Sequence, residues 1–422
     1  MRVLLISANR TEVNMRTMPL GLACVAQAAG REGHEVKILD LVQEKDVPGS
    51  IASAIADLDP EVIGISIRNI DDQEMRNTRF LFEADNAVVS MVRKLSKAPI
   101  VLGGAGYSIY PRAILAASEA DIGIEGEGEA VFNVVLERLR NNETLEGLPG
   151  VHVKGGGLVA EKVLIRAPDA FPLPDPDLLF TAPCDAGDLW IPVQTRRGCP
   201  MRCSYCSTGL IEGTIIRKRS PKSVVEWIAK LKRRGADRLY FTDNTFNLPP
   251  SYAMALCRAM ACASLKVRWR CILYPYRLDE SLVGAMAEVG CSEASIGFES
   301  ANERVLKEMN KRFRRKDVAE TCSLLKRNGI RQMVFLLLGG PCETIESVRE
   351  SLAFADSLEP EFMRVTIGIR IYPGTALAEQ ARKEGVIAPD DDLLLPRFYI
   401  APGLDGDEVR ELAAIYMAKR PH

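Results

Sequence analysis

The chain has 422 residues, 47% of them hydrophobic, which is enough for two or three domains with sizeable cores. Its 54 Lys and Arg residues nearly balance 56 Asp and Glu residues, so a net charge of −2 offers no bulk field for binding nucleic acid. The N-terminus has too short an apolar run for a signal peptide, and no stretch reaches the roughly 18 apolar residues of a membrane span. We therefore expect a cytoplasmic globular protein with no nucleic-acid partner and no membrane span.

Residues 1–145 alternate short β-rich apolar runs with loops or amphipathic stretches. The runs are 2–7, 36–41, 62–67, 100–104 and 122–126. They predict an α/β domain with a flavodoxin-like (Rossmann-like), doubly wound parallel sheet, in which ligands bind at the carboxyl ends of the strands. Glycines gather at two such ends, in "LGGAG" (102–106) and "EGEGE" (125–129), where the backbone can approach a ligand closely. The alternative is that these glycines only end strands.

Residues 146–188 break this alternation. The stretch 151–163 predicts a hairpin, and the proline-rich stretch 167–179 predicts a linker. Six new β-rich runs follow at 189–197, 237–243, 266–274, 293–300, 331–339 and 363–371, most of them with a helical stretch behind. They predict a partial (β/α)6 TIM-type barrel over 189–385, with function in the loops at the carboxyl ends of its strands. We assign no role to the C-terminal segment 386–422.

The loop after the first barrel strand contains Cys199, Cys203 and Cys206 at C-x3-C-x2-C spacing. Three thiols cannot all pair with one another, and a closed zinc site needs four ligands. An iron–sulfur cube is normally held by four thiolates, so three would leave one iron open. No other pair of cysteines has such close spacing, and the three histidines, His34, His152 and His422, lie far apart. A site built from several imidazoles is therefore not expected.

The loop "GCPMRCSYC" (198–206) resembles the cluster-binding loop of the radical S-adenosylmethionine (SAM) enzymes. The stretches "FTDNTF" (241–246), "SIGFES" (295–300), "LLLGGPCET" (336–344) and "RIYPGT" (370–375) follow in that family's order. Residues 19–41 and 122–132 resemble the cobalamin-binding domain that precedes the radical domain in cobalamin-dependent members. The resemblance covers roughly residues 1–385.

The resemblance implies that the three cysteines are the metal ligands of a [4Fe–4S] cluster whose open iron binds the amine and carboxylate of SAM. One electron, from a reductant such as flavodoxin or ferredoxin, then cleaves SAM to methionine and a 5′-deoxyadenosyl radical. Tyr205 would contact the adenine, Glu299 the ribose, Asp243 the ammonium, and Lys311 or Arg315 the carboxylate. The further SAM-binding candidates are Asn244, Ser300, Gly339, Gly340 and Tyr372.

Each of these residues also has a plainer interpretation. Tyr205 can pack beneath the loop, and the two acids can cap the helices that follow them. The basic run 309–316, which contains Lys311 and Arg315, can be a solvated helix face. We assign no residue that acts on the substrate itself.

For cobalamin, the candidates lie at the strand ends of the first domain. They are Thr17, Pro19, Ser66, Arg68, Asn69, Gly103, Gly104, Ala105, Glu125, Gly126, Glu127 and Gly128. The D-x-H-x-x-G motif, whose histidine binds cobalt from below in many cobalamin proteins, is absent, so we expect no histidine ligand. Arg68, which has no lone pair to offer, would crowd the lower axial position, and Asn69 would hold a water or offer a weak oxygen. Alternatively, Arg68 pairs with Asp71 or Asp72.

Three functions remain open. The first is a cobalamin-dependent methyltransferase that modifies an unactivated carbon, or phosphorus, of a small-molecule substrate bound between the two domains. The second is a cyclase or rearrangement enzyme with the same cofactors, and the third is a non-catalytic iron–sulfur or metal-binding protein. A methylthiotransferase is disfavoured because that family needs a second cluster and several N-terminal cysteines, whereas Cys24 is alone in its domain.

Overall fold

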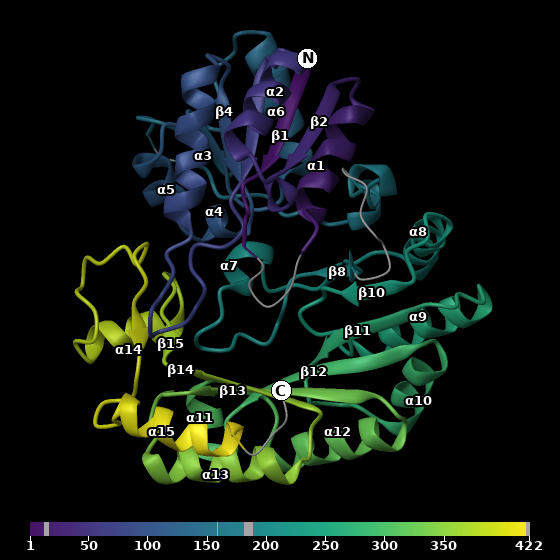
Figure 1. Ribbon diagram of the computed structural model, residues 1–422, viewed down its shortest axis with the longest axis vertical. Coiled ribbons are helices and arrows are strands. Elements are labelled where there is room, and N and C mark those ends of the chain that lie inside the picture. The colour runs from purple at the N-terminus through teal and green to yellow at the C-terminus, as the bar shows by residue number, and fades with distance from the viewer. Residues whose placement is uncertain (12–16, 158, 181–188, 419–422) are drawn as a thin grey trace. The chain divides into compact units, whose positions relative to one another are not determined.

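The computed structural model describes residues 1–11, 17–157, 159–180 and 189–418. They form two compact units (Figure 1). The first comprises 1–72, 79–189 and 210–213, and the second comprises 73–78, 190–209 and 214–422. The end of the expected linker (181–188) and the last four residues, including His422, lie outside the described residues. None of the helices that the structure describes is both long and apolar enough to cross a bilayer.

The first unit contains a six-stranded sheet in the order β2-β1-β3-β4-β5-β6. The strands are β1 (Arg2–Ser7), β2 (Glu35–Asp40), β3 (Val62–Ser66), β4 (Ile100–Gly103), β5 (Ile122–Ile124) and β6 (Val151–Val153). The first five are parallel, and β6 joins the edge antiparallel to β5. This order confirms the predicted flavodoxin-like sheet. β1 and β3 pair up to Ser7 and Ser66, so both strands end level at the switch point.

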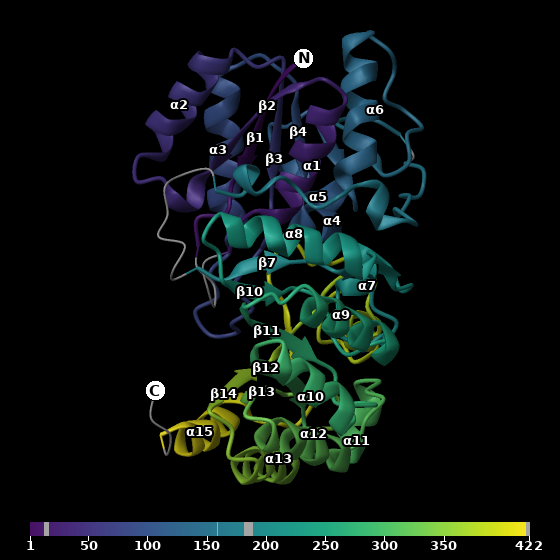
Figure 2. The same ribbon diagram turned by 90° about the vertical axis from the view of Figure 1, so that its right-hand side faces the viewer.

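Helices cover both faces of this sheet (Figure 2). They are α1 (Leu20–Arg31), α2 (Val47–Leu58), α3 (Phe82–Leu95), α4 (Ala105–Ile109), α5 (Pro111–Ala117) and α6 (Gly128–Arg140), with a 3-10 turn at Leu41–Gln43. α1 packs against α6, and α2 packs against α3. Val3, Leu5 and Val62 of the central strands are fully or almost fully buried beneath α1 and α6. Burial on both faces explains why these strands read as continuous apolar runs.

The stretch expected to form a hairpin, 151–163, instead gives a single strand, β6, among the described residues. Gly155, Gly156 and Gly157 follow β6 and have no side chains to pack on a partner strand. The free edge of β5 provides the pairing partner. The chain then returns, and the N–H of Gly150 donates to the carbonyl of Ala160 at 2.9 Å. Two short 3-10 turns, Pro168–Ala170 and Pro176–Leu178, follow in the proline-rich stretch.

The second unit contains a six-stranded parallel sheet in the order β14-β13-β12-β11-β10-β7. The strands are β7 (Ile191–Val193), β10 (Arg238–Phe241), β11 (Arg268–Leu273), β12 (Cys291–Glu299), β13 (Arg331–Leu338) and β14 (Phe362–Ile367). Each strand neighbours the next one along the chain, as in an opened TIM barrel. This topology confirms the predicted partial (β/α)6 barrel.

Helices follow the strands and lie along the outer side of the curved sheet (Figure 1). They are α8 (Pro221–Arg233), α9 (Pro250–Cys262), α10 (Glu280–Glu288), α11 (Glu303–Glu308), α12 (Arg315–Arg327), α13 (Ile345–Ser357) and α14 (Ala376–Lys383). α8 illustrates why they form. Ser220 caps its first turn by accepting from the N–H of Ser223, and Pro221 follows at a position that needs no N–H. Its buried side chains recur at helical spacing: Val224, Trp227, Ile228 and Leu231.

Short elements complete the second unit. They are the pair β8 (Arg196–Arg197) and β9 (Arg217–Lys218), the pair β15 (Ile369–Arg370) and β16 (Phe398–Tyr399), and α15 (Gly406–Met417). The short helix α7 (Thr208–Glu212) begins in this unit, and its residues from Leu210 onward belong to the first unit. The N–H of Ala401 donates to the carbonyl of Gly339 at 3.0 Å, and α15 packs against α13 and β14. The C-terminal residues that the structure describes are therefore part of this unit's packing.

Glu343 fixes the turn after β13. Its side chain accepts hydrogen bonds from the N–H groups of Gly339 and Gly340, and Gly339 adopts a φ of +98° that favours glycine. The residue is buried, and its Oε1 has no partner among the described residues. Burial raises the pKa of Glu343 to about 7, although the two N–H groups act in the opposite direction. The carboxyl group therefore keeps its proton up to a higher pH in the folded chain than an ordinary glutamate does.

This shift predicts a pH-dependent stability. Because the folded pKa exceeds the unfolded value of 4.5, the contribution is complete below about pH 4.5 and is lost as the pH rises through about 7. At pH 8 the free energy of unfolding should be lower, by roughly 3 kcal/mol, than it would be if Glu343 kept its ordinary pKa. All three tryptophans, Trp190, Trp227 and Trp269, lie in the second unit, so their fluorescence during urea unfolding reports on that unit. Glu343→Gln keeps an acceptor for the glycines and should remove this loss, whereas equal pH profiles for both proteins would contradict it.

Candidate functional site

The three cysteines lie in one loop of the second unit, between β8 and α7. Cys199, Cys203 and Cys206 are partly exposed, and none is in a helix or strand. Gly198 enters the loop with a φ of +87°, and Arg202 adopts a φ of +53° inside it. These left-handed conformations turn the chain sharply, so the loop can wrap around a bulky group.

Two neighbouring segments fix the backbone of this cysteine loop. The N–H of Ser204 donates to the carbonyl of Met309 at 3.0 Å, and its carbonyl accepts from the N–H of Leu377 at 2.8 Å. Leu377 is in the first turn of α14, where N–H groups lack intrahelical partners. The amide of Asn310 donates to the carbonyl of Arg202 at 2.6 Å. The segments after β12 and β14 therefore position the loop, and no motif in the sequence indicated these contacts.

Buried thiols elsewhere in the second unit are poor cluster ligands. Cys257, Cys271 and Cys291 are buried. Burial raises the pKa of Cys257 to about 12 and that of Cys271 well above its ordinary value. Burial also raises the pKa of Cys203 in the loop, so close spacing and partial exposure, and not the pKa, distinguish the three loop thiols from these buried cysteines.

The arrangement of the described side chains also fits a cluster better than a single ion. No group of three or more His, Cys, Asp or Glu residues in the described ranges is placed so that it could hold one metal ion. A cube takes each thiolate on a different iron, so its ligands do not converge on one atom. The described residues therefore contain no arranged site for a single metal ion, and binding of a [4Fe–4S] cluster by the three loop cysteines stays a prediction.

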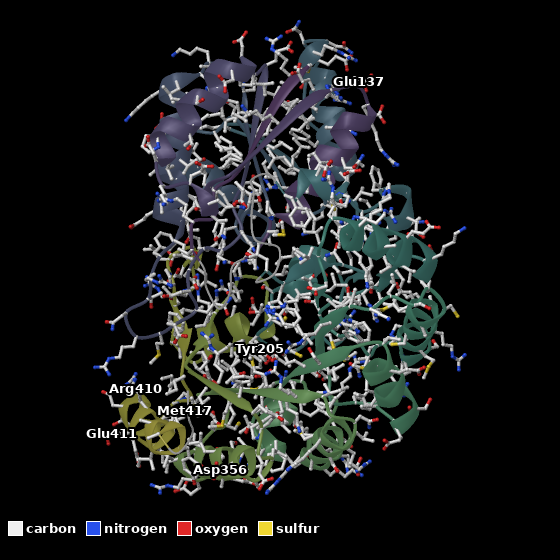
Figure 3. The ribbon with its side chains drawn as sticks, turned by 45° about the vertical axis from the view of Figure 1, so that its right-hand side comes forward. Glu137, Tyr205, Asp356, Arg410, Glu411 and Met417 are labelled. Atoms are coloured by element: carbon white, nitrogen blue, oxygen red, sulfur yellow. The ribbon has the colours of Figure 1, made fainter. Side chains whose placement is uncertain are left out.

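A buried polar group lies beside the cysteine loop and consists of Tyr205, Glu299 and Lys311. The Lys311 ammonium donates to Oε1 of Glu299 and to the Tyr205 hydroxyl, both at 2.9 Å. The Tyr205 hydroxyl donates to the same Oε1 at 2.8 Å. The Lys311 side chain is only 4% exposed. Tyr205, labelled in Figure 3, is partly exposed. Three residues predicted to contact SAM separately are here one another's partners.

Charge pairing determines the protonation of this group. Burial alone lowers the pKa of Lys311, but Glu299 and Tyr205 outweigh it and hold that pKa well above its ordinary value. Burial, followed by the Glu299 charge, raises the pKa of Tyr205 well above its ordinary value. Lys311 therefore stays a cation and Tyr205 a neutral phenol. Both hydrogen bonds to Glu299 use Oε1, so Oε2 faces no bond from Lys311 or Tyr205.

The backbone of β12 positions the Glu299 carboxylate. The ladder between β12 and β13 shifts register between Gly297 and Glu299, and Glu299 adopts a φ of +65°, which is uncommon for a non-glycine residue. A Cβ at Gly297 would lie 2.9 Å from Oε1 of Glu299. Glycine at 297 therefore leaves room for the carboxylate to turn inward.

Asp243, predicted to bind an ammonium, is occupied by the protein. It is 1% exposed, and its oxygens accept from the N–H of Thr195 at 2.8 Å, the hydroxyl of Thr195 at 2.6 Å and the N–H of Arg196 at 3.1 Å. The Arg196 guanidinium lies 3.3 Å from the same carboxylate. These contacts anchor the strand end that leads into the cysteine loop. Contact of Asp243 with SAM stays a prediction, and the anchoring role was not expected from sequence.

The other predicted SAM residues occupy different surroundings. Thr208 connects the Cys206 thiol, 3.3 Å away, with Oδ1 of Asn244, 3.4 Å away. Ser300 is fully buried and bonds Ser351 at 3.0 Å, so its side chain serves packing. Arg315 is exposed and pairs with Glu350 at 3.1 Å. Lys311, not Arg315, thus has the buried position beside the cysteine loop.

Tyr372, Gly339 and Gly340 follow the last two strands of the sheet. The carbonyl of Tyr372 accepts from the Thr375 hydroxyl, which also caps α14. Gly339 and Gly340 spend their N–H groups on Glu343. These residues shape the turns at the carboxyl ends of β13 and β14, and their contact with SAM stays a prediction.

At the carboxyl ends of the first unit's strands, the two glycine loops are joined by Ser108. Its hydroxyl donates to the carbonyl of Gly104 at 2.8 Å and accepts from the N–H of Gly126 at 2.9 Å. Gly104 has a φ of +100°, and a Cβ there would lie 2.5 Å from the carbonyl oxygen of Ile67. The glycine at 104 is therefore required by the close approach to the end of β3. Ser108, two residues beyond "LGGAG", was missed from sequence.

The acids of the second glycine loop hold the segment that crosses it. Glu125 pairs with His152 at 3.2 Å and with Lys162 at 2.7 Å, and burial opposed by these partners leaves the pKa of Glu125 lowered. Glu127 accepts from the N–H of Ile165 at 2.6 Å. The two acids therefore hold Lys162 and Ile165 at this loop, and contact of Gly126 and Gly128 with cobalamin stays a prediction.

Other predicted cobalamin residues lie near the same edge. Thr17 has a buried hydroxyl without a partner among the described residues, and Pro19 precedes α1. Ser66, Arg68 and Asn69 end and follow β3. Gly103 ends β4, Gly104 caps α4, and Ala105 begins that helix. The two glycine loops, 102–106 and 125–129, and the Thr17 hydroxyl, which has no partner among the described residues, fit a large ligand with polar edges, such as a corrinoid.

The two histidines among the described residues have other partners. His34 lies beside the N-terminal amine, at 3.3 Å, and His152 pairs with Glu125. The residues between 12 and 16 in the loop after β1 lie outside the described ranges. Cobalt without a histidine ligand stays a prediction.

Two family models match the chain. The model of the radical SAM superfamily matches residues 193–355, which include all three loop cysteines, Glu299 and Lys311. The model of the B12 binding domain matches residues 6–136, which include both glycine loops. Together these domains imply SAM, an iron–sulfur cluster and cobalamin as the cofactors.

Relatives cover nearly the whole chain. An uncharacterized methyltransferase of Pyrococcus horikoshii is 29% identical over 393 residues, which are 90% of this chain and 83% of the relative. A cytidylyl-2-hydroxyethylphosphonate methyltransferase of Streptomyces wedmorensis is 26% identical over 484 residues, covering 98% of this chain and 88% of the relative.

A solved structure shares the fold. TsrM, a radical SAM methyltransferase from Kitasatospora setae solved with cobalamin and a [4Fe–4S] cluster bound, matches with a TM-score of 0.86 at 21% identity. The match covers 98% of this chain and 90% of TsrM. With a radical SAM domain around the cysteine loop and a B12 binding domain ahead of it, the chain belongs to the cobalamin-dependent radical SAM enzymes.

Proposed function

We propose that this enzyme transfers a methyl group to a carbon or phosphorus centre of a small-molecule substrate. The observation that carries the proposal is the buried Tyr205–Glu299–Lys311 group beside a half-exposed cysteine loop, in a chain that also contains a B12 binding domain. Methyltransferases among the relatives support the reaction class. When bound, the cofactors supply the methyl group, the carrier for it and the one-electron chemistry.

The residues of the second unit bind and orient in this proposal. Cys199, Cys203 and Cys206 hold a [4Fe–4S] cluster. Glu299 keeps Oε1 on Lys311 and Tyr205, so Oε2 accepts from a ribose hydroxyl of SAM. The positive charge of Lys311 stays near the carboxylate of SAM, and burial of the group keeps water away from it.

The residues of the first unit bind cobalamin mainly through backbone groups. Ser108 sets the spacing of the two glycine loops, and Gly104 and Gly126 let the backbone approach the ligand. The Thr17 hydroxyl donates to a polar edge of the corrinoid, because it otherwise lacks a partner among the described residues. A small acidic electron carrier such as flavodoxin or ferredoxin supplies the electron.

Product mass tests the reaction class. We expect anaerobic incubation with SAM, a reductant and candidate extracts to yield a product heavier than its substrate by one methylene unit. Methyl-deuterated SAM should transfer its label to that product. An isomeric product, or one that has only lost hydrogen, would instead establish a rearrangement or a cyclisation and overturn the proposal.

A glycine substitution tests whether the two glycine loops of the first unit hold cobalamin. Gly104→Ala places a Cβ against the carbonyl of Ile67, so it should lower the amount of cobalamin retained after gel filtration severalfold while iron content stays unchanged. Gly33→Ala is the matched control, because Gly33 also has a positive φ, of +80°, but no atom within 4 Å of the added Cβ. Equal loss of cobalamin in both variants would show that backbone strain, and not the glycine loops, is responsible.

A further inference from the structure

The segment from α11 into α12 is strongly basic. Residues 303–316 contain seven Lys or Arg residues against two glutamates, although the whole chain has a net charge of −2. Lys311 alone among these cations points into the protein and is paired there. The others create a local positive field on an otherwise balanced chain.

This basic segment lies directly against the cysteine loop. Met309 accepts from the N–H of Ser204, and Asn310 donates to the carbonyl of Arg202. The N–H of Arg312 donates to the Tyr274 hydroxyl at 2.8 Å. The segment therefore packs against the cysteine loop through Met309 and Asn310, and its exposed cations lie within a few residues of these contacts.

Most cations of this face have no acidic partner in the described part of the chain. The exposed residues without such an ion pair are Arg202, Arg304, Lys307, Arg312, Arg314 and Lys316. Exposed cations that are not internally neutralised are available to a partner's carboxylates. We call these six residues the basic face.

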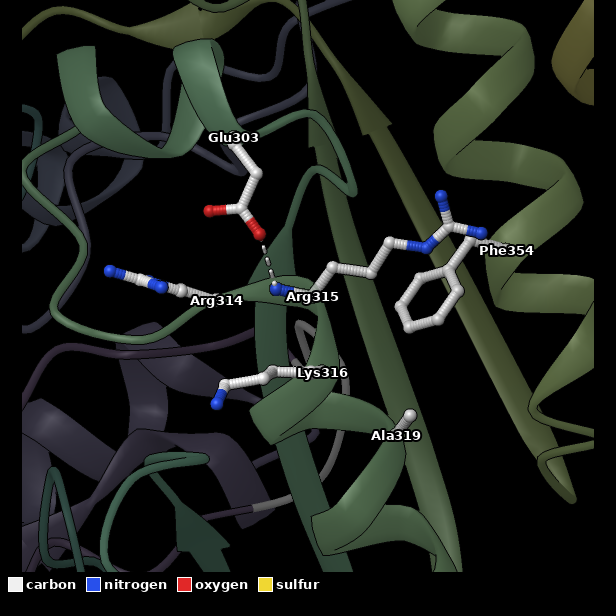
Figure 4. Close-up of a pocket in the computed structure, with 6 residues that line it drawn as sticks. All are labelled: Glu303, Arg314, Arg315, Lys316, Ala319 and Phe354. Carbon is white, nitrogen blue, oxygen red and sulfur yellow. Dashed lines mark hydrogen bonds between the residues drawn. The ribbon is translucent and has the colours of Figure 1, made fainter.

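Arg314 and Lys316 also line an open hollow of about 590 Å³, with Glu303, Arg315, Ala319 and Phe354. Arg315 bonds Glu303 through its N–H, and its guanidinium stacks 4.6 Å from the centre of the Phe354 ring (Figure 4). Arg314 and Lys316 extend the other way, away from Phe354 (Figure 4). Arginine and aromatic side chains are both enriched at protein interfaces, and Arg315 and Phe354 supply one of each in this hollow.

We propose that the basic face is the docking surface for the acidic one-electron carrier protein that reduces the cluster. The proposal rests on the proposed function, because it requires a reducible cluster in the cysteine loop. Electron transfer favours the shortest separation, and this face lies on the cysteine loop and the segment that packs against it. Its charge opposes that of an acidic carrier, which steers the encounter and speeds association by tenfold or more at low salt.

The test compares two reductants on the same protein. The variant Arg312→Glu, Arg314→Glu, Lys316→Glu reverses three charges of the basic face and changes no residue proposed to hold a cofactor. Stopped-flow reduction of the cluster by reduced flavodoxin should become about tenfold slower at low ionic strength, and the difference should shrink as salt is added. Reduction by dithionite, a small reductant that needs no docking, should stay unchanged.

The control variant is Lys230→Glu, Arg258→Glu, Lys266→Glu. These exposed residues lie near the ends of α8 and α9 and ahead of β11, and thus at the amino-terminal side of the sheet, opposite the cysteine loop. It has the same change in charge and should leave the flavodoxin rate within about twofold of the unaltered protein.

Equal slowing in both triple variants, or no slowing in the first, would overturn the docking surface. A dithionite rate that also falls in the first variant would overturn it too, because the damage would then lie in the cluster. If dithionite reduces no cluster in the unaltered protein, the proposed function fails, and the docking surface fails with it.

Discussion

The ion pair between Lys311 and Glu299 is the interaction on which the candidate site of the second unit depends. An ammonium group that is almost fully buried needs a charged partner, and removing one member of such a pair typically costs roughly 3–5 kcal/mol. The Lys311 ammonium also donates to the hydroxyl of Tyr205, a residue of the cysteine loop. One buried charge thus ties β12, the basic segment and the cysteine loop together.

This arrangement explains why cations adjacent in sequence have opposite fates. Lys311 turns inward to Glu299, whereas Arg312, Arg314 and Lys316 are exposed. The bonds from Met309 and Asn310 to the cysteine loop force the chain to pass over that loop at this point. Arg312, Arg314 and Lys316 follow these contacts directly and are exposed to solvent.

Much of the fold could be predicted from sequence because it depends on periodicity. Each of the five apolar runs of the first unit and the six of the second overlaps a strand, because strands that pack on at least one face keep a recurring apolar pattern. The hairpin over 151–163 was wrong because pairing depends on which sheet edge is free. The apolar pattern of residues 151–163 predicts strands, but it does not show that residues 151–153 pair with the free edge of β5.

The candidate site was predictable at the level of residue types but not of partners. The cysteine spacing marked the loop, yet the bonds of Ser204 to Met309 and Leu377 are between backbone groups and leave no trace in sequence. Asp243 illustrates the same limit, since a carboxylate after a strand reads alike whether it binds a ligand or the strand's own neighbours. Side-chain pairing is a tertiary property, and only coordinates reveal it.

The most direct test of this account is the iron content of a variant that lacks the three loop thiols. Changing Cys199, Cys203 and Cys206 to alanine should abolish the visible absorbance of the cluster and all cleavage of SAM, because the buried thiols elsewhere cannot replace them. The matched control changes two exposed cysteines outside the loop, Cys262→Ala and Cys342→Ala, and should retain both properties. An iron content of the triple variant that stays at about four atoms per chain would contradict the assignment of the cluster to this loop.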